Sequence, residues 1–131
     1  MKTVDVVCGI IVREKKFLAE KRKSNEKLDP GLICLPGGHV DSNENKEDAL
    51  KREMIEELNI IVKKARFVKK GFWTASNGEK QNIYYYFILD YEGEPSCKEA
   101  KELLWIEDVN KLDASIDRKI IKEIKNGEFN L

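Results

Sequence analysis

Residues 37–60 read "GGHVDSNENKEDALKREMIEELNI", and this segment crowds acidic side chains together in a chain of zero formal net charge. Its glutamates are Glu44, Glu47, Glu53, Glu56 and Glu57. Like charges three and four residues apart on a helix repel each other by about 0.2–0.5 kcal/mol per pair. The last three of these glutamates fall within five residues, so we expect a bound cation to compensate for their repulsion.

The pattern from 45 to 59 predicts an amphipathic helix that brings these carboxylates together. Its apolar positions recur at helical spacing and form one stripe, made of Leu50, Met54, Ile55 and Leu58. On a helical wheel, Glu53, Glu56 and Glu57 share an arc of about 100° beside this stripe. A solvent-facing charged surface is the alternative, but such a surface mixes charge signs and points away from the core. The arrangement instead favours a cleft in which acidic groups hold a cation.

The available ligands indicate which cation this is. The chain has no Cys-x-x-Cys pair and its lone histidine is His39, so a zinc site is not expected. Oxygen ligands select a hard cation, Mg²⁺ or Mn²⁺, and Mg²⁺ commonly binds a few carboxylates together with substrate phosphates. Such ions polarise phosphoryl groups and activate water. The expected reaction is therefore metal-assisted hydrolysis of a phosphoanhydride.

The rest of the chain consists mainly of β-branched and apolar runs that predict strands. The expected strands cover 3–12, 17–23, a short stretch after the turn at 30–31, 60–76, 81–93 and 102–109. The sequence "SIDRKIIKEIKNG" (115–127) predicts a closing amphipathic helix that ends at Gly127. We therefore expect a single α/β domain over residues 1–131, with a mixed sheet between helices.

Composition and charge restrict the partners and the compartment. Lys and Arg together number 24, as do Asp and Glu, so no overall field draws the chain to a nucleic acid polymer or a membrane. The sequence lacks the run of about 18 apolar residues that a membrane span requires. Cys8, Cys34 and Cys97 are widely spaced and are expected to be free, buried thiols. Since the N-terminus does not have the pattern of a secretory signal, we expect a cytoplasmic protein.

The segment 38–60 resembles the Nudix box, G-x5-E-x7-R-E-U-x-E-E-x-G-U, where U is a bulky aliphatic residue. The matching residues are Gly38, Glu44, Arg52, Glu53, Met54, Glu56, Glu57 and Ile60. Asn59 stands where the family has glycine, and Asn is the residue that best replaces glycine in a left-handed helix cap. The resemblance implies a Nudix-like α/β/α sandwich that hydrolyses small nucleotide substrates as a monomer or homodimer.

The resemblance also implies roles for individual residues. The implied metal ligands are Glu53, Glu56, Glu57 and the backbone carbonyl of Gly38. Glu44 would anchor the loop to the helix, with an outer contact to the metal site as the alternative. Arg52 would assist catalysis by holding the loop or a glutamate in place. The general base would be a box glutamate such as Glu53, or a glutamate on a later loop.

Outside the box the chain resembles MutT-like nucleoside triphosphate pyrophosphohydrolases. In "YEGEPSCKEAKELLWI" (91–106), Glu99 falls where these relatives have a metal-associated glutamate, and Glu102 is the competing candidate. In "AEKRK" (19–23), Arg22 matches an arginine that reaches substrate phosphates. For each of these residues, a surface position without a catalytic role is the alternative.

The candidates for nucleoside recognition are Asp117 and Trp73. Asp117 lies nearest to the position that reads the purine edge in MutT-like relatives, and helix capping by Ser115 or Asp117 is the alternative. Trp73 is the aromatic side chain most suited to stacking on a base.

The expected substrate is an NTP or dNTP, including those with an oxidised purine, cleaved to a nucleoside monophosphate and pyrophosphate. ADP-ribose ranks second, although Ser76 stands where ADP-ribose hydrolases tend to have proline. Coenzyme A ranks third. A nucleotide-binding module without catalytic activity is the alternative from a different class of protein.

Overall fold

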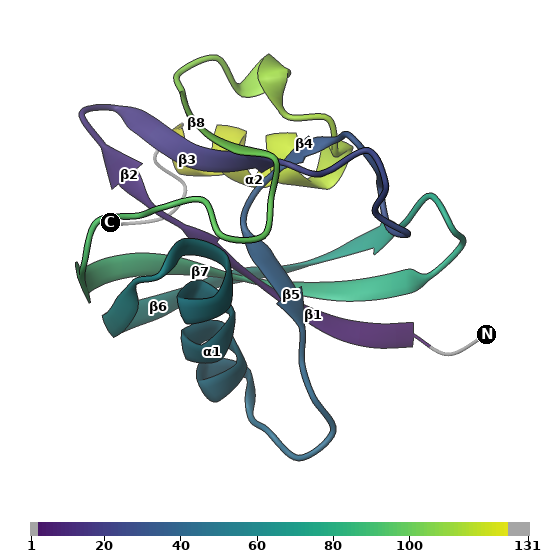
Figure 1. Cartoon of the computed structure of the whole chain (residues 1–131), viewed down its shortest axis with the longest axis horizontal. Helices are drawn as coiled ribbons and strands as arrows, with labels where there is room; N and C mark the ends of the chain where they lie inside the picture. Colours follow the sequence, from purple (N-terminus) through teal and green to yellow (C-terminus); the bar gives the residue numbers. More distant parts are fainter. Residues whose placement is uncertain (1–2, 126–131) are drawn as a thin grey trace.

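The computed structural model describes residues 3–125 and contains two helices and two β-sheets. In chain order the elements are β1 (Thr3–Ile10), β2 (Val12–Arg13), β3 (Lys16–Lys21), β4 (Ile33–Cys34), β5 (Gly37–His39), α1 (Lys46–Leu58), β6 (Ile61–Thr74), β7 (Lys80–Glu92), β8 (Glu102–Ile106), the 3₁₀ helix η1 (Val109–Lys111) and α2 (Ser115–Lys125). Figure 1 shows α1 in the lower half of the view and α2 in the upper half, with the strands of the first sheet between them.

The first sheet has the strand order β5-β1-β7-β6 and is mixed, because β1 pairs parallel to β7 and antiparallel to β5. The second has the order β2-β3-β4, with β8 also paired to β3. The expected mixed sheet is thus confirmed, but the strands form two sheets where we expected one. The strand expected at 3–12 is divided at Ile11, after which the hairpin of β2 and β3 begins. Glu14 and Lys15 in its turn have φ values of 51° and 66°, which matches the left-handed turns that suit the twist of hairpins.

Alternating side chains of β1 enter two different cores, as the two-residue period of a strand requires. Val6 and Cys8 belong to one core, which includes Ile120 of α2. Val7 belongs to the other, which includes Met54 of α1. The first sheet is therefore covered by a helix on each face, and this is the expected α/β/α sandwich.

Helix α1 begins and ends close to the residues that the sequence predicts. The side chain of Asn45 accepts a hydrogen bond from the Asp48 amide at 2.8 Å, which caps the N-terminus. Asn59 follows the last turn with φ 57° and ψ 39°, and its amide donates to the Ile55 carbonyl at 3.0 Å. The expected left-handed cap at Asn59 is confirmed, so the departure from the Nudix consensus at this position leaves the helix end intact.

Helix α2 is joined to the strands through the buried carboxylate of Asp117, which is 3% exposed. One oxygen accepts a hydrogen bond from the Leu35 amide at 3.1 Å, and the other accepts one from the Tyr85 hydroxyl. Burial raises the pKa of Asp117 to about 6, although these two hydrogen bonds oppose the increase. The expected end of this helix at Gly127 lies outside the described residues.

The cysteines differ in exposure, contrary to the expectation that all three are buried. Cys8 is buried, Cys34 is intermediate and Cys97 is exposed in the loop before β8, and all three are free thiols. Within residues 3–125, no helix is long and apolar enough to cross a membrane.

The left-handed conformation of Asn59 gives a prediction for stability. Asn59→Gly should retain the free energy of unfolding, because glycine adopts this conformation without a steric cost. Asn59→Ala should lower it by about 1 kcal/mol or more, because a Cβ without a compensating polar group disfavours positive φ. Urea unfolding of the two variants and the unmodified protein measures the difference. Equal stability of the two variants would contradict the role assigned to this cap.

The raised pKa of Asp117 gives a prediction for pH dependence. The folded value of about 6 exceeds the ordinary value of 3.8, so the folded state binds more protons between these values and stability falls as the pH rises through this range. The total decrease in the free energy of unfolding over this pH range is on the order of 2–3 kcal/mol. Asp117→Asn should flatten the dependence of the unfolding free energy on pH between about 4 and 6.

Tyr85→Phe provides the opposite control. It removes a hydrogen bond that lowers the pKa of Asp117, so the pH-dependent loss of stability should extend to higher pH. Urea unfolding at several pH values measures both variants. Parallel pH profiles for the two variants and the unmodified protein would show that Asp117 does not titrate in this range.

Candidate active site

A cleft of about 380 Å³ lies between α1, β3, the segments around 22–35 and the 99–100 loop. Its lining includes most of the residues singled out from the sequence: Arg22, Gly38, Arg52, Glu53, Glu57, Trp73, Glu99 and Asp117. Glu44 and Glu56 instead contact Arg52 at the outer side of α1. The cleft therefore unites candidate residues from positions 22 to 117 of the chain.

Helix α1 directs Glu53 and Glu57 into this cleft from the edge of its apolar stripe. Residues four positions apart lie on the same helix face, and these two side chains are buried beside Met54 and Leu58. Gly38 lies directly against the Glu53 carboxylate, and a Cβ at this position would collide with it. A side chain at position 38 would therefore displace the Glu53 carboxylate from its observed position.

Burial makes both glutamates harder to ionise. Burial raises the pKa of Glu53 to about 6; Arg52 opposes this increase, and the charges of Glu56 and Glu99 add to it. Burial also raises the pKa of Glu57 to about 7, with further contributions from Glu99 and Glu53. The cleft consequently favours the entry of positive charge.

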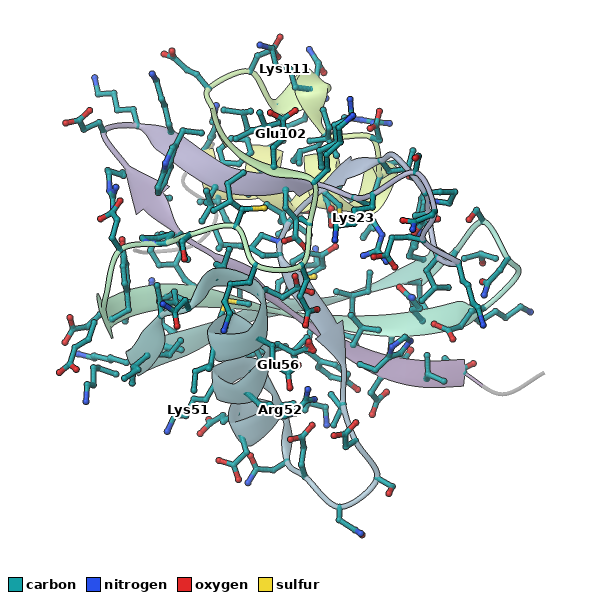
Figure 2. The ribbon with its side chains drawn as sticks, viewed as in Figure 1. Lys23, Lys51, Arg52, Glu56, Glu102 and Lys111 are labelled. Atoms are coloured by element: carbon teal, nitrogen blue, oxygen red, sulfur yellow. The ribbon has the colours of Figure 1, made fainter. Side chains whose placement is uncertain are left out.

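Arg52 connects the helix to the preceding loop. It donates to both oxygens of Glu44, at 3.0 and 2.6 Å, and to the His39 carbonyl at 2.9 Å. The same guanidinium reaches Glu56 at 3.1 Å and Glu53 at 3.3 Å. Figure 2 shows Arg52 and Glu56 as neighbours on α1. The arginine thus occupies the place that the resemblance implies for it, between the loop and the glutamates.

The carboxylates of the cleft suit a hard divalent ion, but in this arrangement they do not form a complete metal site. Among residues 3–125, no three His, Cys, Asp or Glu side chains are grouped closely enough to hold a metal ion. Glu53 and Glu57 face the cleft, whereas Glu56 is engaged by Arg52. The carboxylate-rich lining and the approach of Gly38 to Glu53 nevertheless fit the oxygen coordination of Mg²⁺ or Mn²⁺. Rotation of the Glu56 side chain away from Arg52 would bring the third box glutamate to the same region.

The structure separates the two later candidates for the general base. Glu99 lines the cleft, and its charge raises the pKa of Glu57. Its loop is attached to α1, since the Ser96 amide donates to the Leu58 carbonyl at 2.9 Å. Glu102 is exposed on β8, and Figure 2 shows it beside β3 and away from α1. The geometry therefore favours Glu99.

Sequence reasoning missed Glu20, which lines the cleft from β3 and is 2% exposed. Burial and the charge of Glu57 raise the pKa of Glu20 to about 9. The indication in the sequence was an acidic residue directly after "FLA", within an otherwise apolar strand. Identifying it required knowledge of which face of β3 meets α1.

Trp73 also lines the cleft, and Asp29 holds its side chain by a hydrogen bond. The indole nitrogen of Trp73 donates to the Asp29 carboxylate at 3.0 Å. The Ser76 amide donates to the other oxygen of Asp29, and the Asp29 amide donates to the Ser76 hydroxyl. These bonds attach the loop before β4 to the hairpin of β6 and β7. Asp117 lines the same cleft.

Arg22 also lies in the cleft, and its own loop restrains it. Its Nε donates to the Leu28 carbonyl at 2.8 Å, and a terminal nitrogen lies 3.6 Å from Glu26. Its charge lowers the pKa of Glu20 and of Glu57. The side chain of Arg22 is therefore close to the carboxylates of Glu20 and Glu57.

Comparison with known proteins identifies the family. The NUDIX domain model matches residues 2–124. An 8-oxo-dGTP diphosphatase of Buchnera aphidicola subsp. Schizaphis graminum is 34% identical over 109 residues, covering 81% of this chain and 78% of the relative. An ADP-ribose pyrophosphatase of Methanocaldococcus jannaschii is 35% identical over 130 residues, covering 92% and 74%. The crystal structure of a MutT NUDIX hydrolase from Burkholderia pseudomallei superposes with a TM-score of 0.82 at 27% identity, covering 95% of this chain and 99% of that structure.

These matches agree with the fold. Nudix hydrolases generally use divalent metal ions and act on small nucleotide substrates. The chain therefore belongs to the Nudix family and is a hydrolase that acts on the phosphoanhydride bonds of nucleotides.

Proposed function

We propose that this protein is a Mg²⁺-dependent pyrophosphohydrolase that converts a nucleoside triphosphate to a nucleoside monophosphate and pyrophosphate. The observation that carries this proposal is the pair of buried carboxylates, Glu53 and Glu57, in a cleft that also has Trp73 and Asp117 among its lining residues. The carboxylates suit a metal-bound phosphate chain, and the indole ring of Trp73 suits a base. Mn²⁺ is expected to replace Mg²⁺, because both prefer oxygen ligands.

The metal-binding residues in this proposal are Glu53, Glu56, Glu57 and the Gly38 carbonyl. A divalent ion bound there would neutralise the phosphate charge and lower the pKa of a bound water. Arg52 would keep the Gly38 loop against Glu53 while Glu56 turns towards the cleft. Because Arg52 also binds Glu44 and the His39 carbonyl, the loop would remain anchored when its contact with Glu56 is lost.

The chemical step is attack of water on an internal phosphorus. An oxygen–phosphorus bond forms, the phosphoanhydride bond breaks, and pyrophosphate leaves. We assign the proton of the water to Glu99, which lines the cleft on a loop attached to the end of α1. Arg22 would bind phosphate oxygens from the β3 side of the cleft.

Trp73 and Asp117 are the proposed contacts for the base. The indole ring is fixed through Asp29, so little conformational entropy would be lost when a base stacks on it. The carboxylate of Asp117 would face the polar edge of the base. The relative from Buchnera is named an 8-oxo-dGTP diphosphatase, which supports a purine nucleoside triphosphate, including an oxidised one, as the substrate.

ADP-ribose is the second candidate, and the comparison with Methanocaldococcus jannaschii favours it. That relative is named an ADP-ribose pyrophosphatase and matches over 92% of this chain. Hydrolysis of ADP-ribose at the same site would give AMP and ribose 5-phosphate instead of pyrophosphate. Product analysis therefore separates the two candidates with one preparation of protein.

Glu53→Gln tests the proposed metal chemistry. With Mg²⁺ present, we expect the unmodified protein to release pyrophosphate from one or more of a panel of NTPs, dNTPs and oxidised dNTPs. Glu53→Gln should reduce kcat by about 100-fold or more, since a carboxylate that serves the reacting centre contributes on this scale. Glu47→Gln is the matched control, because Glu47 is exposed in the first turn of the same helix. Turnover without a divalent ion, or full activity of Glu53→Gln, would refute the proposal.

Trp73→Leu tests the proposed base contact. Stacking on an aromatic side chain is worth about 1–3 kcal/mol per base, so its loss should increase KM by about ten-fold or more with a smaller change in kcat. Phe72→Leu is the matched control, because Phe72 is the neighbouring aromatic residue and is 68% exposed. Steady-state kinetics on the preferred nucleotide measures both variants. An equal increase of KM in both would argue against a specific contact at Trp73.

A further inference from the structure

Glu20 is buried in β3, directly after the buried apolar residues Phe17, Leu18 and Ala19 of the same strand. Alternate residues of a strand share a face, so Glu20 lies on the same face as Leu18. Leu18 packs in the core that contains Met54 of α1. The strand therefore directs Glu20 towards the acidic helix, and its side chain lines the cleft opposite Glu57.

The Oε2 atom of Glu20 is buried and has no hydrogen-bond partner within residues 3–125. Burying a polar atom without a hydrogen-bond partner is costly, and Glu57 and Glu53 lie close enough for their charges to act on Glu20. A residue that only filled space here could be apolar, as its three predecessors are. The acidic side chain at this position is therefore explained best by a ligand that approaches it in the cleft.

The neighbouring positive charge does not supply that partner. Arg22 is the cation whose charge acts on Glu20, but its Nε donates to the Leu28 carbonyl and a terminal nitrogen lies near Glu26. An ion that enters the cleft would meet oxygens from two elements, Glu57 from α1 and Glu20 from β3.

We propose that Glu20 is a further carboxylate ligand of the divalent cation site, which binds the ion through Oε2 from the β3 side of the cleft. This inference rests on the proposed function and adds a ligand outside the Nudix box. The additional negative charge would increase the affinity for Mg²⁺ and Mn²⁺, because affinity at oxygen sites depends on the number of charged ligands. It would also provide a ligand on the opposite wall from α1.

The test is a titration of the full chain with Mn²⁺, in which the free ion is measured by electron paramagnetic resonance. Glu20→Gln preserves the size of the side chain and removes its charge, and it should weaken Mn²⁺ binding by about ten-fold or more. Glu102→Gln is the matched control, because Glu102 is exposed on the adjacent strand β8. This control should bind Mn²⁺ as the unmodified protein does.

Thermal unfolding gives a second measurement. Thermal unfolding of Glu20→Gln without metal supplies the reference for its response to Mn²⁺. The rise in Tm of this variant on addition of Mn²⁺ should be smaller than that of the unmodified protein. Glu20→Leu, which is apolar like the residues before it in β3, should behave in the same way and provides a second folded variant.

The Mn²⁺ titrations distinguish a failure of the Glu20 proposal from a failure of the proposed function. Mn²⁺ affinity in either Glu20 variant equal to that of the unmodified protein would overturn the role of Glu20 as a ligand, even if catalytic activity fell. Absence of Mn²⁺ binding by the unmodified protein would instead refute the proposed function, and this inference with it. Weaker binding in the Glu20 variants, together with normal binding in Glu102→Gln, would support the ligand.

Discussion

The burial of Glu53 and Glu57 against the apolar core is the constraint on which the rest of the site depends. Because burial disfavours a charged carboxylate, each additional acidic group near this pair increases the preference for a bound positive charge. The oxygen atoms that line the cleft favour hard divalent ions over other cations. A phosphate chain carries negative charge of its own, so it can approach these carboxylates only with cations. In the proposed function, metal binding and substrate binding would therefore be coupled by the same electrostatic requirement.

Arg52 allows so many acidic groups to lie in one small region. Its guanidinium contacts Glu44, Glu53 and Glu56 and also the His39 carbonyl. The planar fork of arginine can donate in several directions at once, which the compact ammonium of lysine cannot do in the same geometry. The arginine consequently stabilises the loop as well as the charges. This double contact keeps Gly38 against Glu53 and so brings a backbone segment and a carboxylate to one point.

The sequence predicted the helix and its left-handed cap at Asn59 because these depend on interactions within a few residues. Leu50, Met54 and Leu58 of the expected apolar stripe are buried, whereas Ile55 is exposed. The sequence did not predict the division of the strands into two sheets, which depends on long-range pairing. Long-range packing likewise limited what the sequence could predict about the site. Whether Glu20 faces α1 or solvent is decided by the packing of β3 on another sheet, and whether Glu56 contacts Arg52 or the cleft is decided by side-chain rotation. Asp117, which could have been a simple helix cap, is instead bonded to residues more than 30 positions away.

The residues proposed for the chemistry and those proposed for nucleoside recognition lie on separate segments of the chain. The proposed metal ligands of the Nudix box lie on α1 and, for Gly38, on β5, whereas Trp73 lies on β6 and Asp117 on α2. Asp29 joins the segment that contains Arg22 to Trp73 and Ser76, so the proposed phosphate contact and the proposed base contact belong to one hydrogen-bonded unit. A change in this segment would therefore shift the base and the phosphates together. Substitutions there can alter the choice of nucleotide while the acidic helix, whose geometry is set by Arg52 and the core, remains unchanged.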